Sequence, residues 1–242
     1  KLLLIIDICT FFLTVTSTAV VKRGIATKME EDKENFFKSL KEGWLAVYSR
    51  KGIFLLIIIS SVMTCFMGAF QILAEPLILA FTDSTTLGIG ETVCASGMLV
   101  SSLLLGIKGI SKNYTKILCI SLTLAGLSMV GFGIWENIIL ICVFGFCFFA
   151  MLPFANNCLD YLARTNIPDE LQGRAWGFIG FLSQIGYVVA YSVSGVLADF
   201  IGKEARIGVG RGAAWVIIGA GICLAIISAL TIKSKSIRGL EK

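Results

Sequence analysis

The sequence contains no histidine, and charged residues are scarce, at 15% of its 242 positions. The lack of histidine excludes a Ser-His-Asp triad, a Cys-His nucleophile and a histidine-ligated zinc site. Soluble domains contain about 25% charged and about 45–50% apolar residues, whereas this chain is 56% hydrophobic. We therefore expect neither a soluble enzyme nor any chemistry that needs an imidazole.

Cysteine is present at eight positions, but these do not form a disulfide or metal framework. No two of them stand in a CxxC pair, and nearly all lie inside apolar runs. We interpret them as small packing residues, and we expect no metal and no cofactor. They are Cys9, Cys65, Cys94, Cys119, Cys142, Cys147, Cys158 and Cys223.

Long apolar stretches dominate the chain and predict membrane helices. A helix needs about 20 mostly apolar residues to cross a bilayer, and seven stretches are of about this length. They predict an all-α, polytopic membrane protein with seven transmembrane helices. The stretches cover residues 2–21, 53–73, 87–106, 117–134, 138–157, 176–198 and 212–232.

Positive charges predict the orientation of these helices. Of the 21 Lys and Arg residues, 17 lie in segments 22–51, 107–116 and 158–174 and in the tail after residue 232. Positively charged loops stay in the cytoplasm, so we expect a multi-pass plasma-membrane protein whose linker and C-terminus are cytoplasmic. This topology explains the basic residues, and we expect no nucleic-acid partner.

The predicted helices divide the chain into four parts. We expect a helix at 1–21 that ends a missing N-terminal half, a cytoplasmic linker at 22–52, a six-helix bundle at 53–232 and a tail at 233–242. In the linker, apolar residues recur at helical spacing from Phe36 to Tyr48, with charges between them. This pattern predicts an amphipathic helix in the membrane interface. A soluble helix packed on a domain outside this chain is the alternative.

The odd number of helices leaves rival classes open. A complete seven-helix chain would be a receptor or sensor, although the last helix, 212–232, lacks the lysine that a retinal protein needs. A membrane enzyme would need a catalytic pair on facing helices, whereas Cys142 and Cys147 share one helix. Because the chain begins with Lys1, we favour a fragment in which one helix precedes a second half of six.

Four stretches resemble the C-terminal half, helices six to twelve, of a major facilitator superfamily transporter. The likeness is greatest to the macrolide-efflux type of drug:proton antiporter. The stretches are Leu4–Leu13 (LIIDICTFFL), Ala95–Gly106 (ASGMLVSSLLLG), Pro168–Phe178 (PDELQGRAWGF) and Ser194–Asp199 (SGVLAD). The loop Gly106–Lys116 keeps the glycine and lysines of the family pattern but lacks its Asp-Arg pair.

This resemblance implies proton-driven export of hydrophobic or cationic drugs across the bilayer by alternating access. It also implies two inverted three-helix repeats, which the residues themselves do not reveal. The expected partners are the drug, protons, lipid and the missing N-terminal half, and we expect that the chain alone does not transport.

Ionisable groups inside membrane helices are costly and are therefore candidate functional residues. Glu91, Glu75 and Asp7 are the candidates for proton coupling or for binding a cationic drug. Gln71 precedes Glu75 by four residues and shares its side of the helix, and Pro76 is expected to bend or end that helix. The alternative is that these carboxylates lie at the headgroup level and contact water.

Further polar candidates lie toward the cytoplasmic side. Asn156 and Asp160 share a helix face, and Arg164 and Arg174 are candidates to pair with Asp160 in a closed cytoplasmic gate. Gly173 is expected in a tight turn beside Arg174. Ordinary interfacial residues are the alternative. Two amides, Asn157 and Gln184, are candidate substrate contacts. Aromatic side chains of Tyr187, Tyr191 and the run 142–154 are candidates to line a drug cavity.

Overall fold

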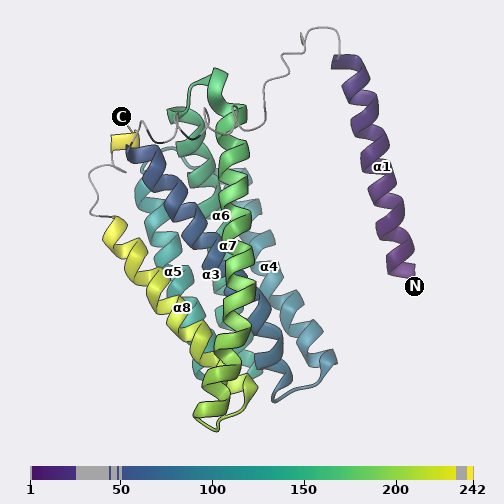
Figure 1. The fold of residues 1–242 in the computed structure, drawn as a ribbon, viewed down its shortest axis with the longest axis vertical. Coiled ribbons are helices and arrows are strands. Elements are labelled where there is room, and N and C mark those ends of the chain that lie inside the picture. Colours follow the sequence, from purple (N-terminus) through teal and green to yellow (C-terminus); the bar gives the residue numbers. More distant parts are fainter. Residues whose placement is uncertain (1, 26–43, 45–47, 49–50, 233–238, 242) are drawn as a thin grey trace. The chain divides into compact units, whose positions relative to one another are not determined.

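The computed structural model describes residues 2–25, 44, 48, 51–232 and 239–241. All regular secondary structure in these residues is helical, which confirms the predicted fold class. Figure 1 shows the long helices in order along the chain. The elements are α1 (Leu2–Ile25), α3 (Lys51–Leu79), α4 (Ser84–Lys108), α5 (Tyr114–Ile134), α6 (Ile138–Asn166), α7 (Asp169–Glu204), α8 (Val209–Thr231) and the 3-10 turn η1 (Gly239–Glu241).

The chain separates into two units, residues 1–38 and residues 39–242. In the first unit, α1 is exposed along its described surface, and the hydroxyls of Thr10, Thr14 and Thr18 donate to carbonyls of the same helix. The described apolar stretch of α1, Ile5–Val21, is shorter than a membrane span. The other predicted membrane helices, α3 to α8, are all long and apolar enough to cross a bilayer.

The short connections at one end of the bundle start helices with side-chain caps. Asp83 accepts a hydrogen bond from the backbone N–H of Thr86 and begins α4. Asn137 accepts from the N–H groups of Ile139 and Leu140 and begins α6. These oxygens satisfy donors that the first turn of a helix leaves without a partner. Polar residues at helix ends therefore set where the apolar helices begin.

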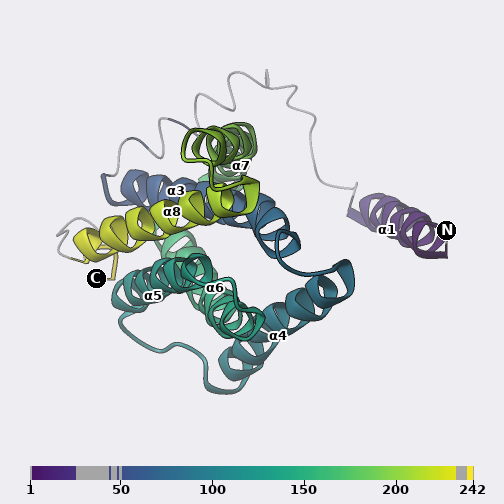
Figure 2. The same ribbon diagram turned by 90° about the horizontal axis from the view of Figure 1, so that it is seen from below.

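The six helices of the second unit form two layers. Viewed along the bundle in Figure 2, α3, α7 and α8 lie together, and α4, α5 and α6 lie together. In the first layer α3 packs on both α7 and α8, and in the second α6 packs on both α4 and α5. The two layers join mainly through α5 and α8.

These pairings follow the symmetric pattern expected of an inverted repeat, which the sequence did not show. Exchanging α3, α4 and α5 with α6, α7 and α8 converts the α3–α7 pair into α6–α4 and the α3–α8 pair into α6–α5. Because successive helices run in opposite directions, the two triplets have opposite topology, as in inverted-repeat transporters. The repeat is imperfect, since α7 packs on α8 whereas α4 makes few contacts with α5.

Small residues allow α5 and α8 to approach closely, at what we call the α5–α8 seam (Gly126, Gly133, Ala214, Gly221 and Ala225). A Cβ atom on Gly126 would lie 2.6 Å from the carbonyl oxygen of Gly221, and the reverse distance is also 2.6 Å. Helix association in lipid depends on such close backbone contact. Small residues of α8, Gly221 and Ala225, therefore let this helix pack closely on α5.

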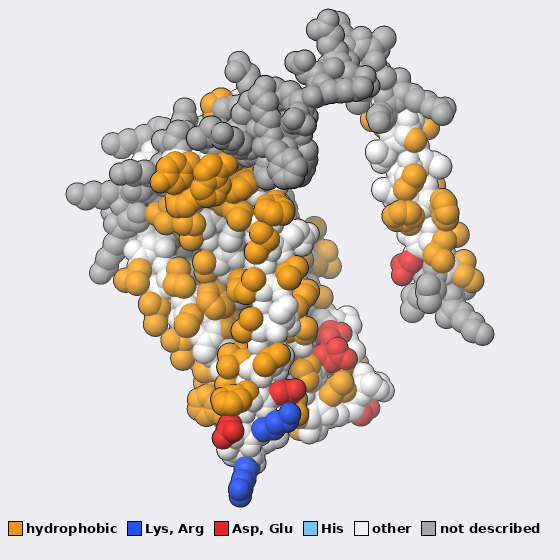
Figure 3. All heavy atoms as spheres, viewed as in Figure 1, with side chains coloured by type: hydrophobic (Ala, Val, Ile, Leu, Met, Phe, Trp, Pro, Cys, Tyr) orange, Lys and Arg blue, Asp and Glu red, His pale blue; other side chains and the backbone are white. Residues whose placement is uncertain are grey.

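Small residues spaced four apart on α7 also pack closely. Ala190, Ser194 and Ala198 of α7 are buried. A Cβ atom on Gly186 would lie 3.0 Å from the carbonyl oxygen of Ser61 in α3, which shows how closely α7 approaches that helix. On the face of the six-helix bundle in Figure 3, apolar side chains cover much of the described surface, and the charged side chains visible among the described residues lie toward the lower end of the view. These features describe a multi-pass membrane protein.

Most of the linker and the tail lies outside the described residues. Trp44 and Tyr48, which belong to the predicted amphipathic helix, are described and helical. The ring centroids of Trp44 and Phe178 of α7 are 5.2 Å apart, and those of Tyr48 and Phe54 of α3 are 5.6 Å apart. These two aromatic residues therefore pack on the bundle, and an interfacial position for the rest of the helix stays a prediction.

Candidate functional site

A cavity of about 210 Å³ lies where α3 and α4 diverge. These two helices make few direct contacts, so side chains line the space between them instead of filling it. The lining residues are Phe70, Gln71, Ala74 and Ile78 of α3, Glu91, Cys94 and Ala95 of α4, Phe132 of α5 and Phe149 of α6. We call this space the α3–α4 cavity.

Aromatic rings form the inner wall of the α3–α4 cavity. The ring of Phe70 lies 4.7 Å from that of Phe132, 4.3 Å from that of Phe148 and 6.2 Å from that of Phe149, measured between centroids. Phe70, Phe132 and Phe148 are almost completely buried. Packed rings at these distances hold one another in place, so the wall presents a firm apolar surface to a ligand.

Two polar side chains enter the same cavity from different helices. Gln71 of α3 and Glu91 of α4 both line it, which brings together two of the predicted candidates. The hydroxyl of Tyr191, on α7, donates to Oε1 of Gln71 at 3.3 Å. The amide is thus oriented from a third helix, and the carboxylate of Glu91 is the acidic group among the lining residues.

The remaining outer candidates do not join this cavity. Glu75 is exposed one turn beyond Gln71 and is not among the lining residues, so the shared side of the helix did not place both in the cavity. Pro76 does not end the helix, because α3 continues to Leu79. Gln184 of α7 is exposed and lines none of the described cavities. Asp7 lies on α1, in the other unit, and is exposed there.

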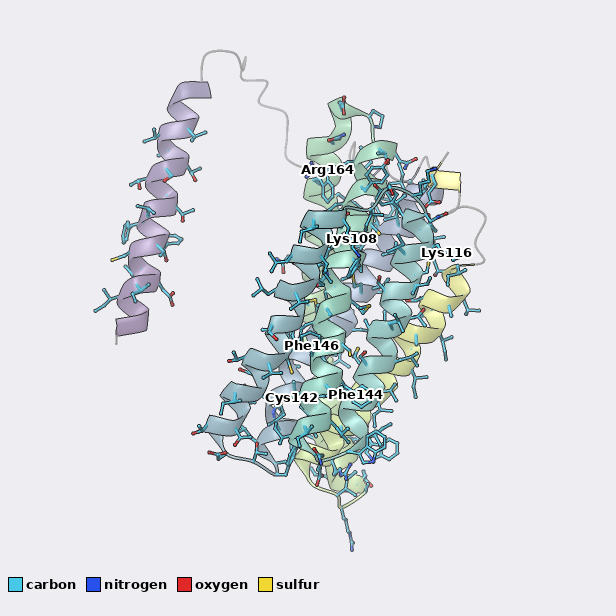
Figure 4. All side chains as sticks on the ribbon, turned by 180° about the vertical axis from the view of Figure 1, so that it is seen from behind. Lys108, Lys116, Cys142, Phe144, Phe146 and Arg164 are labelled. Atoms are coloured by element: carbon cyan, nitrogen blue, oxygen red, sulfur yellow. The ribbon has the colours of Figure 1, made fainter. Side chains whose placement is uncertain are left out.

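A second, smaller cavity lies at the end of the bundle that we call the basic end (Lys108, Lys112, Lys116 and Arg164). Figure 4 shows Lys108, Lys116 and Arg164 toward one end and Cys142 and Phe144 toward the other. The second cavity has a volume of about 70 Å³ and brings Asn156 and Asp160 together, as their spacing predicted. Its other lining residues are Ile53, Leu56, Ile57, Ser60, Leu159, Ala163, Trp176 and Ile179.

Asp160 and Arg164 lie one helical turn apart on α6, and their pairing in a closed gate stays a prediction. Among the ion pairs of the described residues none joins these two side chains, and the guanidinium carbon of Arg164 lies 5.9 Å from the ring centroid of Trp176. Gly173 lies within α7, which begins at Asp169, so the predicted tight turn is wrong. The side chain of Arg174 lies outside the described residues. Asn157 is exposed and lines neither cavity.

The aromatic run 142–154 is distributed over several surroundings. Phe149 lines the α3–α4 cavity, whereas Phe148 belongs to the buried core. Phe146 instead borders an apolar groove of about 490 Å³ between α4 and α6, near Cys142 (Figure 4). Tyr187 reaches α3, where its hydroxyl lies 3.5 Å from the Met67 sulfur. Phe149 thus lines a cavity, whereas a role of these aromatic residues in binding a drug stays a prediction.

The cysteine interpretation is confirmed for three buried positions. Cys94, Cys119 and Cys158 are buried, and no disulfide joins any of the eight cysteines, all of which the structure describes. Among the residues that the structure describes, no cluster of acidic or cysteine side chains has the arrangement of a metal site.

Sequence reasoning missed Phe70, Phe132 and Ala95 as cavity residues. Only the acidic and amide positions stood out against the apolar helices, and an apolar lining residue leaves no such signal.

Similarity to known proteins extends over most of the chain. It is 25% identical over 229 residues to macrolide efflux protein A of Streptococcus pyogenes and, to the same extent, to the protein of that name in S. pyogenes serotype M6. The match covers 89% of this chain but 52% of those proteins, so the chain spans about half the length of the curated relatives it matches. No family model matches the sequence, and no solved structure matches it significantly.

Proposed function

We propose that this chain is the second half of a secondary transporter that exports hydrophobic drugs in exchange for protons. The observation that carries the proposal is the α3–α4 cavity, where Phe70 and Phe149 form an apolar surface beside the carboxylate of Glu91. Apolar walls with a few placed polar groups are typical of small-molecule sites. The similarity to macrolide efflux proteins supports macrolides as substrates.

The size of the cavity supports a site shared with another half. Pockets for drug-sized ligands have volumes of about 300–1,000 Å³, and this one measures about 210 Å³. The relatives are about twice as long as the matched region. In our proposal the remaining wall comes from the N-terminal half, and the drug lies between the two halves. The described chain alone is therefore expected not to transport.

Glu91 is the group that we assign to coupling. The Glu91 side chain is exposed in this half, on the lining of the cavity. Once the N-terminal half covers the cavity, an unpaired carboxylate there costs free energy when it is ionised. Proton binding from one side and release to the other would alternate the affinity of the cavity for a cationic drug. Gln71, oriented by Tyr191, would contact the polar groups of the substrate. In this scheme the basic end faces the cytoplasm, and Asp160 with Arg164 and Arg174 lies at the cytoplasmic gate.

The test is efflux by the complete transporter carrying Glu91→Gln. The variant keeps the shape of the side chain but cannot release a proton, so we expect drug efflux driven by a pH gradient to fall about tenfold or more, which corresponds to about 1.4 kcal/mol. Glu75→Gln is the matched control, since Glu75 lies outside the cavity and should retain efflux. Equal loss in both variants, or loss in neither, would contradict the assignment.

The presence of an N-terminal half is tested separately, by sequencing the coding DNA upstream of Lys1. We expect about five further hydrophobic segments of about 20 residues each in the same reading frame. A start codon directly before Lys1 would instead favour the seven-helix receptor or sensor, which binds a ligand without proton flux.

A further inference from the structure

The segment Gly239–Glu241 lies against the basic end of the bundle, outside the two cavities described above, and Leu240 and Glu241 line a separate polar cavity of about 350 Å³ there. Its single turn of 3-10 helix contacts α3, α5 and α6, three helices that are far from the segment in the sequence. We call this segment the strap. Because it contacts three helices at once, we looked for a function of the strap itself in these contacts.

The strap provides the N-terminal cap of α5. The backbone N–H of Thr115 donates to Oε1 of Glu241 at 2.5 Å. Asn113, at the N-cap position, has left-handed backbone geometry and makes no side-chain capping bond. Capping oxygens normally come from the residue that begins the helix, but this one comes from 126 positions away. The negative carboxylate also suits the positive end of the helix dipole.

The same segment joins α6 and two groups of apolar side chains. The carbonyl of Leu240 accepts from the side-chain nitrogen of Asn166, the last residue of α6, at 2.9 Å. The Leu240 side chain packs against the main core and also against a smaller cluster at the basic end. The buried members of that smaller cluster are Ile53, Ile57, Ala163, Ile167, Ala175 and Phe178.

Three residues of the smaller cluster also line the cavity that contains Asp160. Ile53 and Ile57 of α3 and Ala163 of α6 belong to both. Contacts made by Leu240 therefore hold together the helix ends that border this cavity. Two hydrogen bonds, from Thr115 to Glu241 and from Asn166 to Leu240, and one partly buried leucine are a small attachment, which local opening can release without unfolding the bundle.

We propose that the strap is a releasable lock that holds the basic ends of α3, α5 and α6 together beside the Asp160 cavity. Release of Leu240 and Glu241 would loosen the first turn of α5 and widen the access of water and solutes to the cavity from the basic end. That this opening is a step of the transport cycle rests on the proposed function, whereas the lock itself does not.

The first measurement is hydrogen exchange of the purified chain in detergent. In Glu241→Ala we expect amide exchange in the first turn of α5 to become about fivefold faster, as expected for the loss of a capping oxygen. Exchange in the middle of α8 should not change, which also shows that the variant is folded. Glu204→Ala is the matched control, because Glu204 is an exposed glutamate at the opposite end of α7.

The second measurement asks whether the cavity opens. Ser60 lines the Asp160 cavity, so Ser60→Cys introduces a thiol there. With the strap intact we expect slow alkylation by a water-soluble maleimide. Adding Leu240→Ala should make alkylation about tenfold faster, which corresponds to a loss of ~1.4 kcal/mol from the free energy that holds the strap in place. Mass spectrometry of the peptide that contains residue 60 separates this thiol from the exposed Cys147 and Cys223.

Two results would overturn the proposal. Unchanged exchange in α5 would show that Glu241 does not cap this helix. Faster exchange without faster alkylation would show a cap that does not close the cavity. Neither result depends on efflux, so failure of the Glu91→Gln test and failure of the lock remain distinguishable.

Discussion

The α5–α8 seam and the α3–α4 cavity show two opposite ways of placing neighbouring membrane helices. At the seam the backbones of Gly126 and Gly221 are so close that neither position has room for a Cβ atom. At the cavity α3 and α4 diverge, and an aromatic wall with Gln71 and Glu91 borders the space between them. The seam gains its stability from close contact, whereas the cavity gives up such contact to leave room for a ligand.

The largest effect on stability is expected from adding one methyl group to the seam. In Gly221→Ala the new Cβ atom would lie 2.6 Å from the carbonyl oxygen of Gly126, so one helix must shift. We expect a loss of about 1–3 kcal/mol of unfolding free energy, which is typical of overpacking. Denaturation in mixed micelles, followed by helical circular dichroism, measures this loss.

The control for this substitution lies on the same helix. A Cβ atom on Gly219 would have no heavy atom within 4 Å, so Gly219→Ala should leave stability unchanged or raise it by up to about 1 kcal/mol. Equal destabilisation by the two substitutions would show that the seam does not depend on backbone contact.

A larger side chain at the α3–α4 cavity is expected to leave stability almost unchanged and to weaken ligand binding. Ala95 is exposed and lines the α3–α4 cavity, so Ala95→Leu should change stability by no more than about 0.5 kcal/mol. The larger side chain fills space that a ligand needs, and drug binding to the complete transporter should weaken about tenfold. Ser102→Leu is the control, since this exposed position of α4 lines none of the described cavities. Unchanged binding in Ala95→Leu would separate the cavity from substrate recognition.

A weaker contribution is expected from the ion pair at one end of the seam. Nε of Arg211 in α8 lies 2.6 Å from Oε1 of Glu136, and Nη1 of the same arginine donates to the carbonyl of Ile134 at 3.2 Å. Both side chains are about 40% exposed, so the coupling between them should be about 0.2–1 kcal/mol. A double-mutant cycle with Glu136→Gln and Arg211→Gln measures it, and added salt should reduce it.

The smallest effect concerns the turn that leads into the cavity helix α4. The Asp83 carboxylate accepts one hydrogen bond from the Thr86 hydroxyl, whose oxygen lies 2.5 Å from Asp83 Oδ1, and another from the Thr86 backbone N–H. These two hydrogen bonds hold the pKa of Asp83 below its ordinary value of 3.8. Because the folded pKa is lowered, the stabilisation by this cap is present above the ordinary value and is lost as pH falls through the folded pKa. Carbon NMR of the Asp83 carboxyl should show a midpoint below 3.8 that rises in Thr86→Val. A midpoint that stays unchanged in Thr86→Val would contradict this cause.

The predicted helices were largely confirmed because each one must satisfy its own backbone hydrogen bonds in a bilayer. That requirement produces long apolar runs, which are visible at α3 to α8. The site was recovered only in part. Glu91 and Gln71 stood out as polar residues within apolar helices, but their meeting in one cavity could not be predicted, nor could the exclusion of Glu75. Gly173 was misplaced because the sequence 168–174 does not show where α7 begins.

Composition and periodicity by themselves determined that this is a helical membrane protein, that imidazole chemistry is excluded and which few polar groups lie inside apolar helices. These properties are local, since each depends on one helix and its solvent. Tertiary structure alone decided the inverted pairing, the aromatic wall built around Phe70 and Phe132, and the capping of α5 by Glu241. Such contacts join residues far apart in the chain, and in lipid they depend on the shapes of the helix surfaces more than on hydrophobicity.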